Sequence, residues 1–258
     1  MSMPMADADI ESWGYDLRRA RRDKQRVVVE GFHALKHALR FGAVIESVFA
    51  ADAQQLTALA RELSPDLERE LEQRVTIVNP DVLKRLVPNM PYTGVVAIAE
   101  RPTASDEAIL ANDAKASVIL LENPRHFGNI GAVIRVAAAA DVAGILTTGI
   151  HDPWDPAAIR GAAGLHFAIP VVQCAASLPD TDRQLVALTP QGGRIQPQLI
   201  DERAVLAFGT ERNGLSDELL RRADIRVRLP MRDGVSSLNL ATSVAATLYG
   251  LTIARSSP

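Results

Sequence analysis

Three polar segments, far apart along the chain, carry side chains that could bind a small polar molecule. The last of them runs from Pro230 to Asn239, between a strand-like run that ends at Leu229 and a long apolar segment with helical composition. It contains a glycine and, at the mouth of the helix, the neutral side chains of Ser237 and Asn239. Such a loop offers backbone N–H and carbonyl groups to a ligand without any metal. The same two side chains could equally serve as helix caps.

The first segment, residues 122–135, leaves an apolar strand, turns through Pro124 and Gly128 and enters a helix near Asn129. Asn129 is a good N-cap residue, so a helix start is its simplest interpretation. Arg135 is different, because it lies among Ile, Val and Ala in an apolar helix. A charge buried in such surroundings is rarely without a partner. We therefore expect a functional role for Arg135, with a structural salt bridge as the alternative.

The second segment, residues 208–216, also follows an apolar strand. Gly209 ends that strand, Glu211 places a carboxylate in the loop, and Gly214 permits a turn. Ser216 begins a pattern that suits a helix cap. Taken alone, Glu211 could be an ordinary loop carboxylate exposed to water.

Several common site motifs are missing. The chain has no phosphate-binding P-loop, no G-x-G-x-x-G after a strand and no G-x-S-x-G nucleophile turn. An NAD-type enzyme is disfavoured for that reason. His33 and His37 stand four residues apart, but Ala34 follows His33 where a zinc protease helix has Glu, so we predict no metal site.

Composition limits the possible partners. The 258 residues carry a net charge of −3, so any affinity for nucleic acid must come from local patches. Residues 18–26 (RRARRDKQR) form such a patch, either as an arm that contacts phosphates or as a solvated helix face.

The single cysteine, Cys174, excludes an intrachain disulfide and fits packing in a reducing cytoplasm. Residues 1–10 are acidic and lack the apolar core of a signal peptide. Residues 238–254 are apolar but short and interrupted by polar side chains, which favours a buried helix over a membrane span.

Strands and helices alternate in two blocks, which predicts an α/β fold with ligands at the carboxyl ends of its strands. The predicted domains are a basic arm at 1–25, a small α/β domain at 26–100, a linker at 101–115 and a larger α/β domain at 116–258. Strands are expected at 27–29, 44–50, 75–78, 95–99, 118–121, 144–147, 168–172, 185–188, 205–208 and 225–229. Helices are expected at 32–41, 54–73 with a break at Pro65, 80–87, 107–112, 130–140, 156–162 and 238–254.

Taken together and in this order, the three segments resemble the three signature motifs of the SpoU (TrmH-type) branch of the SPOUT RNA methyltransferases. The matching residues are Asn129-x-Gly131-x-x-x-Arg135, Phe208-Gly209-x-Glu211-x-x-Gly214-Leu215 and Pro230-Met231 followed by Ser237-Leu238-Asn239. The similarity covers residues 116–255. Residues 26–100, beginning Val29-Glu30-Gly31, resemble the ribosomal-protein-like RNA-binding domain of many members. The chain departs from the family at Asp233, where a Gly is common, and at Ala241, where a Ser is common.

The resemblance implies a C-terminal parallel sheet threaded into a trefoil knot that binds S-adenosyl-L-methionine. The implied cofactor-binding residues are Leu188, Thr189, Gly192, Gly209, Leu229, Met231, Ser237 and Leu238. The implied catalytic residues are Arg135, Asn129, Glu211, Ser237 and Asn239. Gly192 would let the backbone approach the adenosyl group closely.

The implied reaction methylates a ribose 2′-hydroxyl in RNA, with ribosomal RNA the first choice and transfer RNA the second. The implied assembly is a homodimer whose RNA site spans the interface. A non-catalytic RNA-binding protein with the same fold is the alternative. Retention of all five catalytic candidates favours the enzyme, because a pseudoenzyme would be free to lose them.

Overall fold

The computed structural model describes residues 7–87, 89–174, 177–210 and 213–256, which group into two compact units. Unit 1 comprises Met1–Pro102 together with Trp154–Ala168. Unit 2 comprises Thr103–Pro153 together with Ile169–Pro258. The sequence prediction assigned residues 154–168 to the larger domain, whereas their contacts place them in unit 1.

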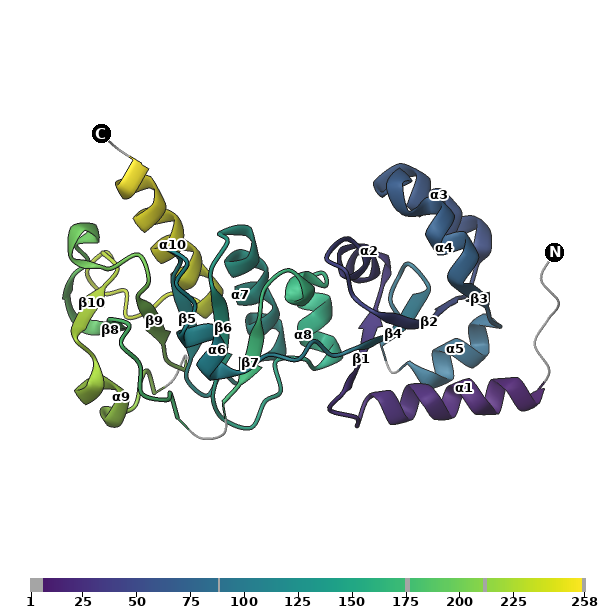
Figure 1. Ribbon diagram of the computed structural model, residues 1–258, viewed down its shortest axis with the longest axis horizontal. Helices are drawn as coiled ribbons and strands as arrows, with labels where there is room; N and C mark the ends of the chain where they lie inside the picture. The colour runs from purple at the N-terminus through teal and green to yellow at the C-terminus, as the bar shows by residue number, and fades with distance from the viewer. Residues whose placement is uncertain (1–6, 88, 175–176, 211–212, 257–258) are drawn as a thin grey trace. The chain divides into compact units, whose positions relative to one another are not determined.

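Unit 1 is built around a four-stranded sheet in the order β1-β4-β2-β3. Strand β4 runs antiparallel to both neighbours, and β2 is parallel to β3. Helices α1 and α5 lie side by side along one face (Figure 1), and Leu17 and Leu83 join Val28, Val96 and Ile98 of the sheet in a core. The elements are α1 (Asp7–Ala20), β1 (Arg26–Glu30), α2 (Phe32–Arg40), β2 (Ile45–Ala50), α3 (Ala53–Leu63), η1 (Pro65–Leu67), α4 (Glu68–Arg74), β3 (Val75–Ile77), α5 (Pro80–Leu86), β4 (Val95–Glu100), α8 (Pro156–Gly161) and η2 (Leu165–Phe167).

Local sequence explains most of these boundaries. The Asp52 side chain accepts hydrogen bonds from the backbone N–H groups of Gln54 and Gln55 and so caps α3. Pro65 cannot continue that helix, which ends at Leu63, so the predicted break is confirmed. The β-branched runs that predicted the strands form β1, β2, β3 and β4 within a residue or two.

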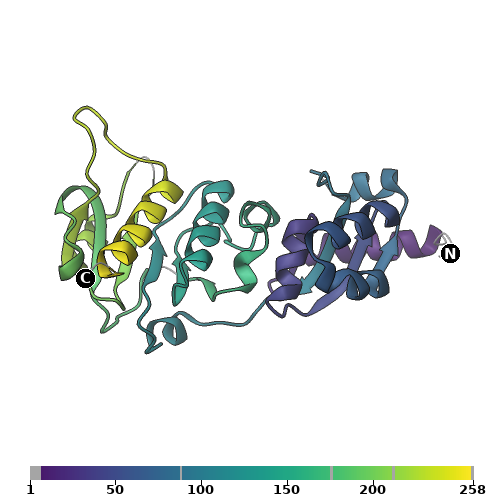
Figure 2. The same cartoon turned by 90° about the horizontal axis from the view of Figure 1, so that it is seen from above.

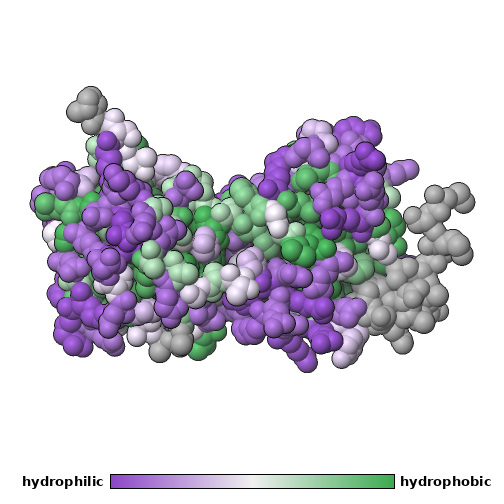
Figure 3. Space-filling model, in the orientation of Figure 1, coloured by the Kyte–Doolittle hydropathy of each residue, from purple (hydrophilic) through white to green (hydrophobic). Residues whose placement is uncertain are grey.

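The basic run is part of unit 1 and not a detached arm, because α1 packs Leu17 and Ala20 into the core. Buried Glu30 accepts a hydrogen bond from Arg21 at 2.6 Å and another from Arg160 of α8 at 2.7 Å. Arg26 pairs with Glu46. The remaining cations, Arg18, Arg19, Arg22 and Lys24, are exposed where α1 leads into β1. Figure 3 shows a strongly hydrophilic surface over this region.

Unit 2 contains a six-stranded parallel sheet in the order β10-β8-β9-β5-β6-β7. Its central strands β5 and β9 are buried on both faces, as in other parallel sheets covered by helices on each side. The elements are α6 (Asp106–Leu110), β5 (Val118–Leu121), α7 (Phe127–Ala139), β6 (Gly144–Thr147), β7 (Val171–Gln173), β8 (Leu185–Arg194), η3 (Pro197–Leu199), β9 (Val205–Phe208), α9 (Asp217–Arg222), β10 (Ile225–Arg228) and α10 (Leu240–Ser256).

Unit 2 has three layers, because helices cover both faces of its sheet. Ile109 of α6 and Leu219 of α9 pack with Val118 and Leu120 of β5 in one core. Strand residues alternate between faces, so Ile119 and Leu121 point to the opposite side. Helices α7 and α10 lie against each other (Figure 2). Helix α10 is buried on one side only, since Val244 and Leu251 are covered while Tyr249 and Ile253 are exposed, which corrects the prediction of a buried helix. No helix in the described residues is long and apolar enough to span a membrane.

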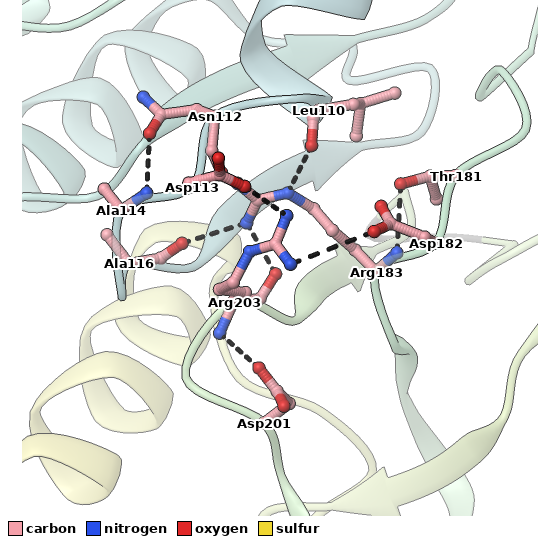
Figure 4. A network of polar contacts seen from close by, with 10 residues as sticks. All are labelled: Leu110, Asn112, Asp113, Ala114, Ala116, Thr181, Asp182, Arg183, Asp201 and Arg203. Atoms are coloured by element: carbon pink, nitrogen blue, oxygen red, sulfur yellow. Dashed lines mark hydrogen bonds and ion pairs between the residues drawn. The ribbon is translucent and has the colours of Figure 1, made fainter.

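A buried arginine holds the amino-terminal edge of this sheet together (Figure 4). Arg183 is 4% exposed, and its guanidinium donates to the carbonyl oxygens of Leu110 at 2.8 Å, Ala116 at 3.0 Å and Arg203 at 2.6 Å. It also donates to the Asn112 carbonyl. Burial, and then the charge of neighbouring Arg203, lowers the pKa of Arg183, although an arginine there stays protonated. The second half of the predicted linker is thereby bound to unit 2.

Cys174 lies in the same core as the Ile109 and Leu110 side chains and is 3% exposed. Burial, and then the negative charge of Asp106, raises the pKa of the Cys174 thiol to about 12. The cysteine is therefore a packing residue, as its apolar surroundings in the sequence predicted.

We expect the R183M substitution to lower the free energy of unfolding by about 2–4 kcal/mol, because it leaves several backbone carbonyls without their donor. The free energy of unfolding of R183K should lie between those of R183M and the wild type, since one ammonium group cannot reach four carbonyls. Urea unfolding followed by circular dichroism measures both. R194M, at the exposed end of β8, is the matched control. An R183M protein as stable as R194M would contradict this role.

Candidate functional site

The three polar segments meet at the carboxyl edge of the sheet in unit 2. Strands β5 and β9 are adjacent, with Leu121 paired to Phe208, so the segments that follow them begin side by side. The backbone N–H of Glu122 donates to the Phe208 carbonyl at 2.9 Å. The chain proceeds from β5 to β6 on one side of this pair, whereas β8 lies on the other. Ligands of open α/β sheets bind at such a switch in strand order.

The loop after β9 is closed tightly on itself. Thr210 and Gly214 exchange backbone hydrogen bonds of 3.1 and 3.0 Å, and the Asn213 N–H donates to the Thr210 hydroxyl. A Cβ on Gly209 would lie 2.0 Å from the Gly214 carbonyl carbon, so only glycine fits there. Glu211, predicted to be catalytic, lies outside the described residues.

A carboxylate that the sequence analysis did not single out anchors this loop. Glu122 follows β5, and its two oxygens accept hydrogen bonds of 2.6 Å from the backbone N–H and the hydroxyl of Ser216. The Ser216 hydroxyl in turn accepts from the Leu219 N–H and caps α9, as predicted. These residues are 94 positions apart, so no local pattern could have paired them. A strand ending in an acidic residue was the only available hint.

The third segment joins the first through two asparagines. The Asn239 side-chain amide donates to the Asn129 side-chain oxygen at 3.1 Å. The Asn239 oxygen also accepts from the N–H of Ala241 at 2.9 Å, so Asn239 caps α10 and contacts α7 at once. Asn129 is not the N-cap that the sequence suggested, because α7 begins at Phe127 and Asn129 lies in its first turn.

The loop before α10 projects beyond the rest of unit 2 (Figure 2), and residues 232–239 are exposed. Gly234 has φ +88°, and the Val235 N–H donates to the Arg232 carbonyl across this turn. Gly234 therefore forms this turn. It lies one position after Asp233, where the chain departs from the SpoU pattern.

A cavity of about 470 Å³ lies between residues 188–191 of β8 and the loops that follow β9 and β10. Its wall is largely apolar or neutral, and Asp217 and Arg228 are the charged residues among its described members. Seven of the eight residues predicted to bind a cofactor line it: Leu188, Thr189, Gly209, Leu229, Met231, Ser237 and Leu238.

Gly192 is the exception. It does not line the cavity but is buried between strands, where a Cβ would lie 2.6 Å from the backbone of Val227. Its carbonyl accepts a hydrogen bond from Arg228 at 3.1 Å. The glycine thus permits close approach of β8 to β10, not of the backbone to a ligand. The pairing of these strands changes register between Arg226 and Val227, and residues 188–191 of β8 line the cavity there.

Arg135 is exposed on α7, contrary to the expectation of a buried charge. It does not line the cavity, and it makes no hydrogen bond or ion pair with another described residue. Measured along the axis of α7, Arg135 lies about 9 Å beyond Asn129. In the described part of the chain, no group of three or more His, Cys, Asp or Glu side chains could hold a metal ion.

A parallel α/β sheet with a loop-built cavity at its carboxyl edge defines a class of proteins that bind nucleotide-like small molecules. The chain belongs to the SpoU rRNA Methylase family, whose model matches residues 116–249, more than half of the sequence. Residues 28–104 match a second model, described as RNA 2′-O ribose methyltransferase substrate binding.

Individual relatives agree with this assignment. An uncharacterized tRNA/rRNA methyltransferase of Mycobacterium bovis is 33% identical over 66% of the chain, and the match spans 62% of that relative's length. The 23S rRNA (adenosine(1067)-2′-O)-methyltransferase of Streptomyces laurentii is 28% identical over 90% of the chain and 87% of its own length. The crystal structure of the SpoU methyltransferase AviRb from Streptomyces viridochromogenes with AdoMet superposes with a TM-score of 0.76 at 27% identity, covering 97% of this chain and 98% of that one.

We expect the E122A substitution to loosen the loop after β9, because two hydrogen bonds to a charged acceptor are lost. Each such bond contributes about 1.5–3 kcal/mol. Hydrogen exchange should show faster exchange of the Ser216 and Leu219 amides, with amides of β5 unchanged. E218A, an exposed carboxylate on α9, serves as the control. Equal exchange at Ser216 in E122A and E218A would rule out the anchor.

Proposed function

We propose that this protein transfers a methyl group from S-adenosyl-L-methionine to a ribose 2′-hydroxyl in RNA, with ribosomal RNA favoured over transfer RNA. The observation that carries the proposal is the cavity built by residues 188–191 of β8 and the loops after β9 and β10, beside the hydrogen bond that joins Asn129 to Asn239. Family membership and the substrates named for its relatives support it. The site needs no metal, and its RNA substrate suggests action in the cytoplasm.

The cavity suits the proposed cofactor in size and chemistry. Its volume of about 470 Å³ lies within the range of roughly 300–1,000 Å³ typical of small-molecule sites. Apolar side chains such as Leu188, Leu229 and Leu238 would enclose an adenine ring. Thr189 and Ser237 would offer hydroxyl groups to its sugar and amino acid parts. When bound, the cofactor supplies an electrophilic methyl group on a sulfonium.

The chain's own task is to activate the ribose hydroxyl, which is a poor nucleophile until its proton leaves. Arginine is not deprotonated in proteins, so we assign Arg135 the stabilisation of the developing alkoxide, with an RNA phosphate as the proton acceptor. Asn129, held by Asn239, would orient the ribose. Glu211 and Ser237 are proposed to position Arg135 and the nucleotide.

Ribosomal RNA is the favoured substrate because unit 1 adds a dedicated RNA-binding body. Residues 28–104 match a substrate-binding family, and the exposed cations of the basic run lie on the same unit. A folded RNA offers the phosphates and shape that such a body recognises. The Streptomyces laurentii relative is named for a 23S rRNA nucleotide.

We further propose a homodimer. Tyr249 is 44% exposed and Ile253 66% exposed on the outer side of α10, one helical turn apart. A second copy of α10 would cover them. Arg135 does not line the cavity of its own chain, so it is available to a site that spans the interface.

We also propose that the sheet is knotted. The segment that leaves β10 lines the same cavity as residues 188–191 of β8 and the loop after β9 before it enters α10. A protein pulled at both termini would then stop short of its full extended length, because the knot tightens.

Labelled S-adenosyl-L-methionine and protein-free ribosomal RNA provide the test of the reaction. We expect R135A to lower kcat on the order of 100–1,000-fold, the loss seen when a group that stabilises transition-state charge is removed. Its Kd for the cofactor, measured by calorimetry, should stay within about twofold, since Arg135 lies outside the cavity wall. R221A, an exposed arginine on α9, is the control. Wild-type turnover by R135A would refute the assignment, and no label in RNA with the wild type would refute the reaction.

Light scattering tests the dimer. The wild type should have twice the chain mass of 27.8 kDa, and I253D should run as a monomer because it places a charge in the apolar contact. L199S, at an aliphatic side chain on η3 that is 54% exposed, should leave the mass unchanged. A monomeric wild type would contradict the proposal.

A further inference from the structure

Two loops at the carboxyl edge of unit 2 form a fixed surface that the proposed reaction does not use. They comprise residues 123–127 after β5 and residues 149–151 after β6, and we call them the edge loops. The Asn123 N–H donates to the Thr148 hydroxyl at 3.0 Å. Gly149, at φ +85°, packs so closely that a Cβ there would lie 2.3 Å from the Asn123 side-chain oxygen. The second loop is thus locked onto the first.

Further contacts hold the second loop from both sides. The His151 ring packs edge-on against Phe127, with centroids 5.3 Å apart. From the end of β7, the Gln173 side-chain amide donates to the Gly149 carbonyl at 2.7 Å. A segment held in this way does not move to hide an apolar side chain.

The side chain at the tip of this rigid loop is nevertheless apolar. Ile150 is 88% exposed, although its neighbours on both sides are packed. Arg125 and His126 are exposed on the adjoining loop, and neither side chain makes a hydrogen bond or ion pair with another described residue. The edge loops therefore present an aliphatic side chain beside a cation, both already ordered.

That combination matches a nucleotide. An arginine binds a phosphate through paired donors, and an exposed aliphatic side chain packs against the face of an unstacked base or wedges between two bases. A ligand with only one of these parts would leave the other half of the surface unused.

The position of the surface identifies the nucleotide of the RNA that would bind there. Residue 127 begins α7, and Asn129 lies in the first turn of that helix, bonded to Asn239. The edge loops therefore adjoin the place proposed for the target ribose. We propose that they bind a nucleotide flanking the target in the RNA, with its phosphate at Arg125 and its base against Ile150. This inference rests on the proposed function for the identity of the RNA and for the position of the target ribose.

Binding of in vitro transcribed 23S rRNA, measured at several salt concentrations, tests the surface. R125Q should weaken RNA binding about fivefold or more and reduce the salt slope by about one counterion. I150A should weaken it by a similar factor with an unchanged slope, because the lost contact with the base is apolar and neutralises no phosphate. L199S is the matched apolar control, and R221Q the matched charge control. All four variants should keep the wild-type Kd for S-adenosyl-L-methionine.

Each outcome separates the inference from the reaction. RNA affinity unchanged in both R125Q and I150A would overturn the edge-loop surface even if methylation proceeds. Wild-type protein that binds the rRNA without methylating it would refute the reaction while leaving the surface supported by the variants. A change in mass by light scattering for I150A would show that a second subunit, not RNA, covers Ile150, and would overturn the inference. Wild-type protein that binds no rRNA would overturn it as well.

Discussion

The buried guanidinium of Arg183 is the constraint on which the geometry of unit 2 depends. It binds carbonyls just before β5 and β9, and Arg183 itself lies two residues before β8. These three neighbouring strands therefore start level, with Val118 and Leu185 both paired to Val205. Because parallel strands of equal rise that start level also stay level, Leu121, Leu188 and Phe208 reach the carboxyl edge together. Arg183, at the amino-terminal edge of the sheet, thus sets the alignment of the loops that form the site at the carboxyl edge.

The loops at the carboxyl edge are held mainly by polar contacts and by backbone packing that only glycine allows. Glu122 fixes the exit of the β9 loop, Asn239 fixes the last loop to α7, and Gly209 lets one loop close on itself. The cavity wall combines apolar side chains such as Leu188 and Leu229 with glycine backbone and the hydroxyl groups of threonines and serines. Such walls recognise a ligand by hydrogen bonds whose directions the fold has already set.

Sequence patterns predicted most of the elements, because strands buried on both faces are short apolar runs and helices alternate with them. They also brought together residues that do meet, such as Asn129 and Asn239. What they missed depends on contacts distant in sequence. The partner of Glu122 is 94 residues away, and Arg160 reaches Glu30 across 130 residues. Arg135 was expected to be buried, because composition shows that a helix is apolar but not which narrow side of it faces water. Gly192 was assigned to a ligand because close backbone approach looks the same in sequence whether the neighbour is a cofactor or a strand.

Burial of Cys174 protects its thiol from thiol reagents. Its thiol is buried, and burial raises the pKa of that thiol to about 12, which disfavours the reactive thiolate. Since it is the only cysteine in 258 residues, one cysteine introduced on the surface would be the sole reactive thiol. A fluorophore or spin label could then be attached to a cysteine that replaces a highly exposed residue such as Tyr92, without removing the native Cys174.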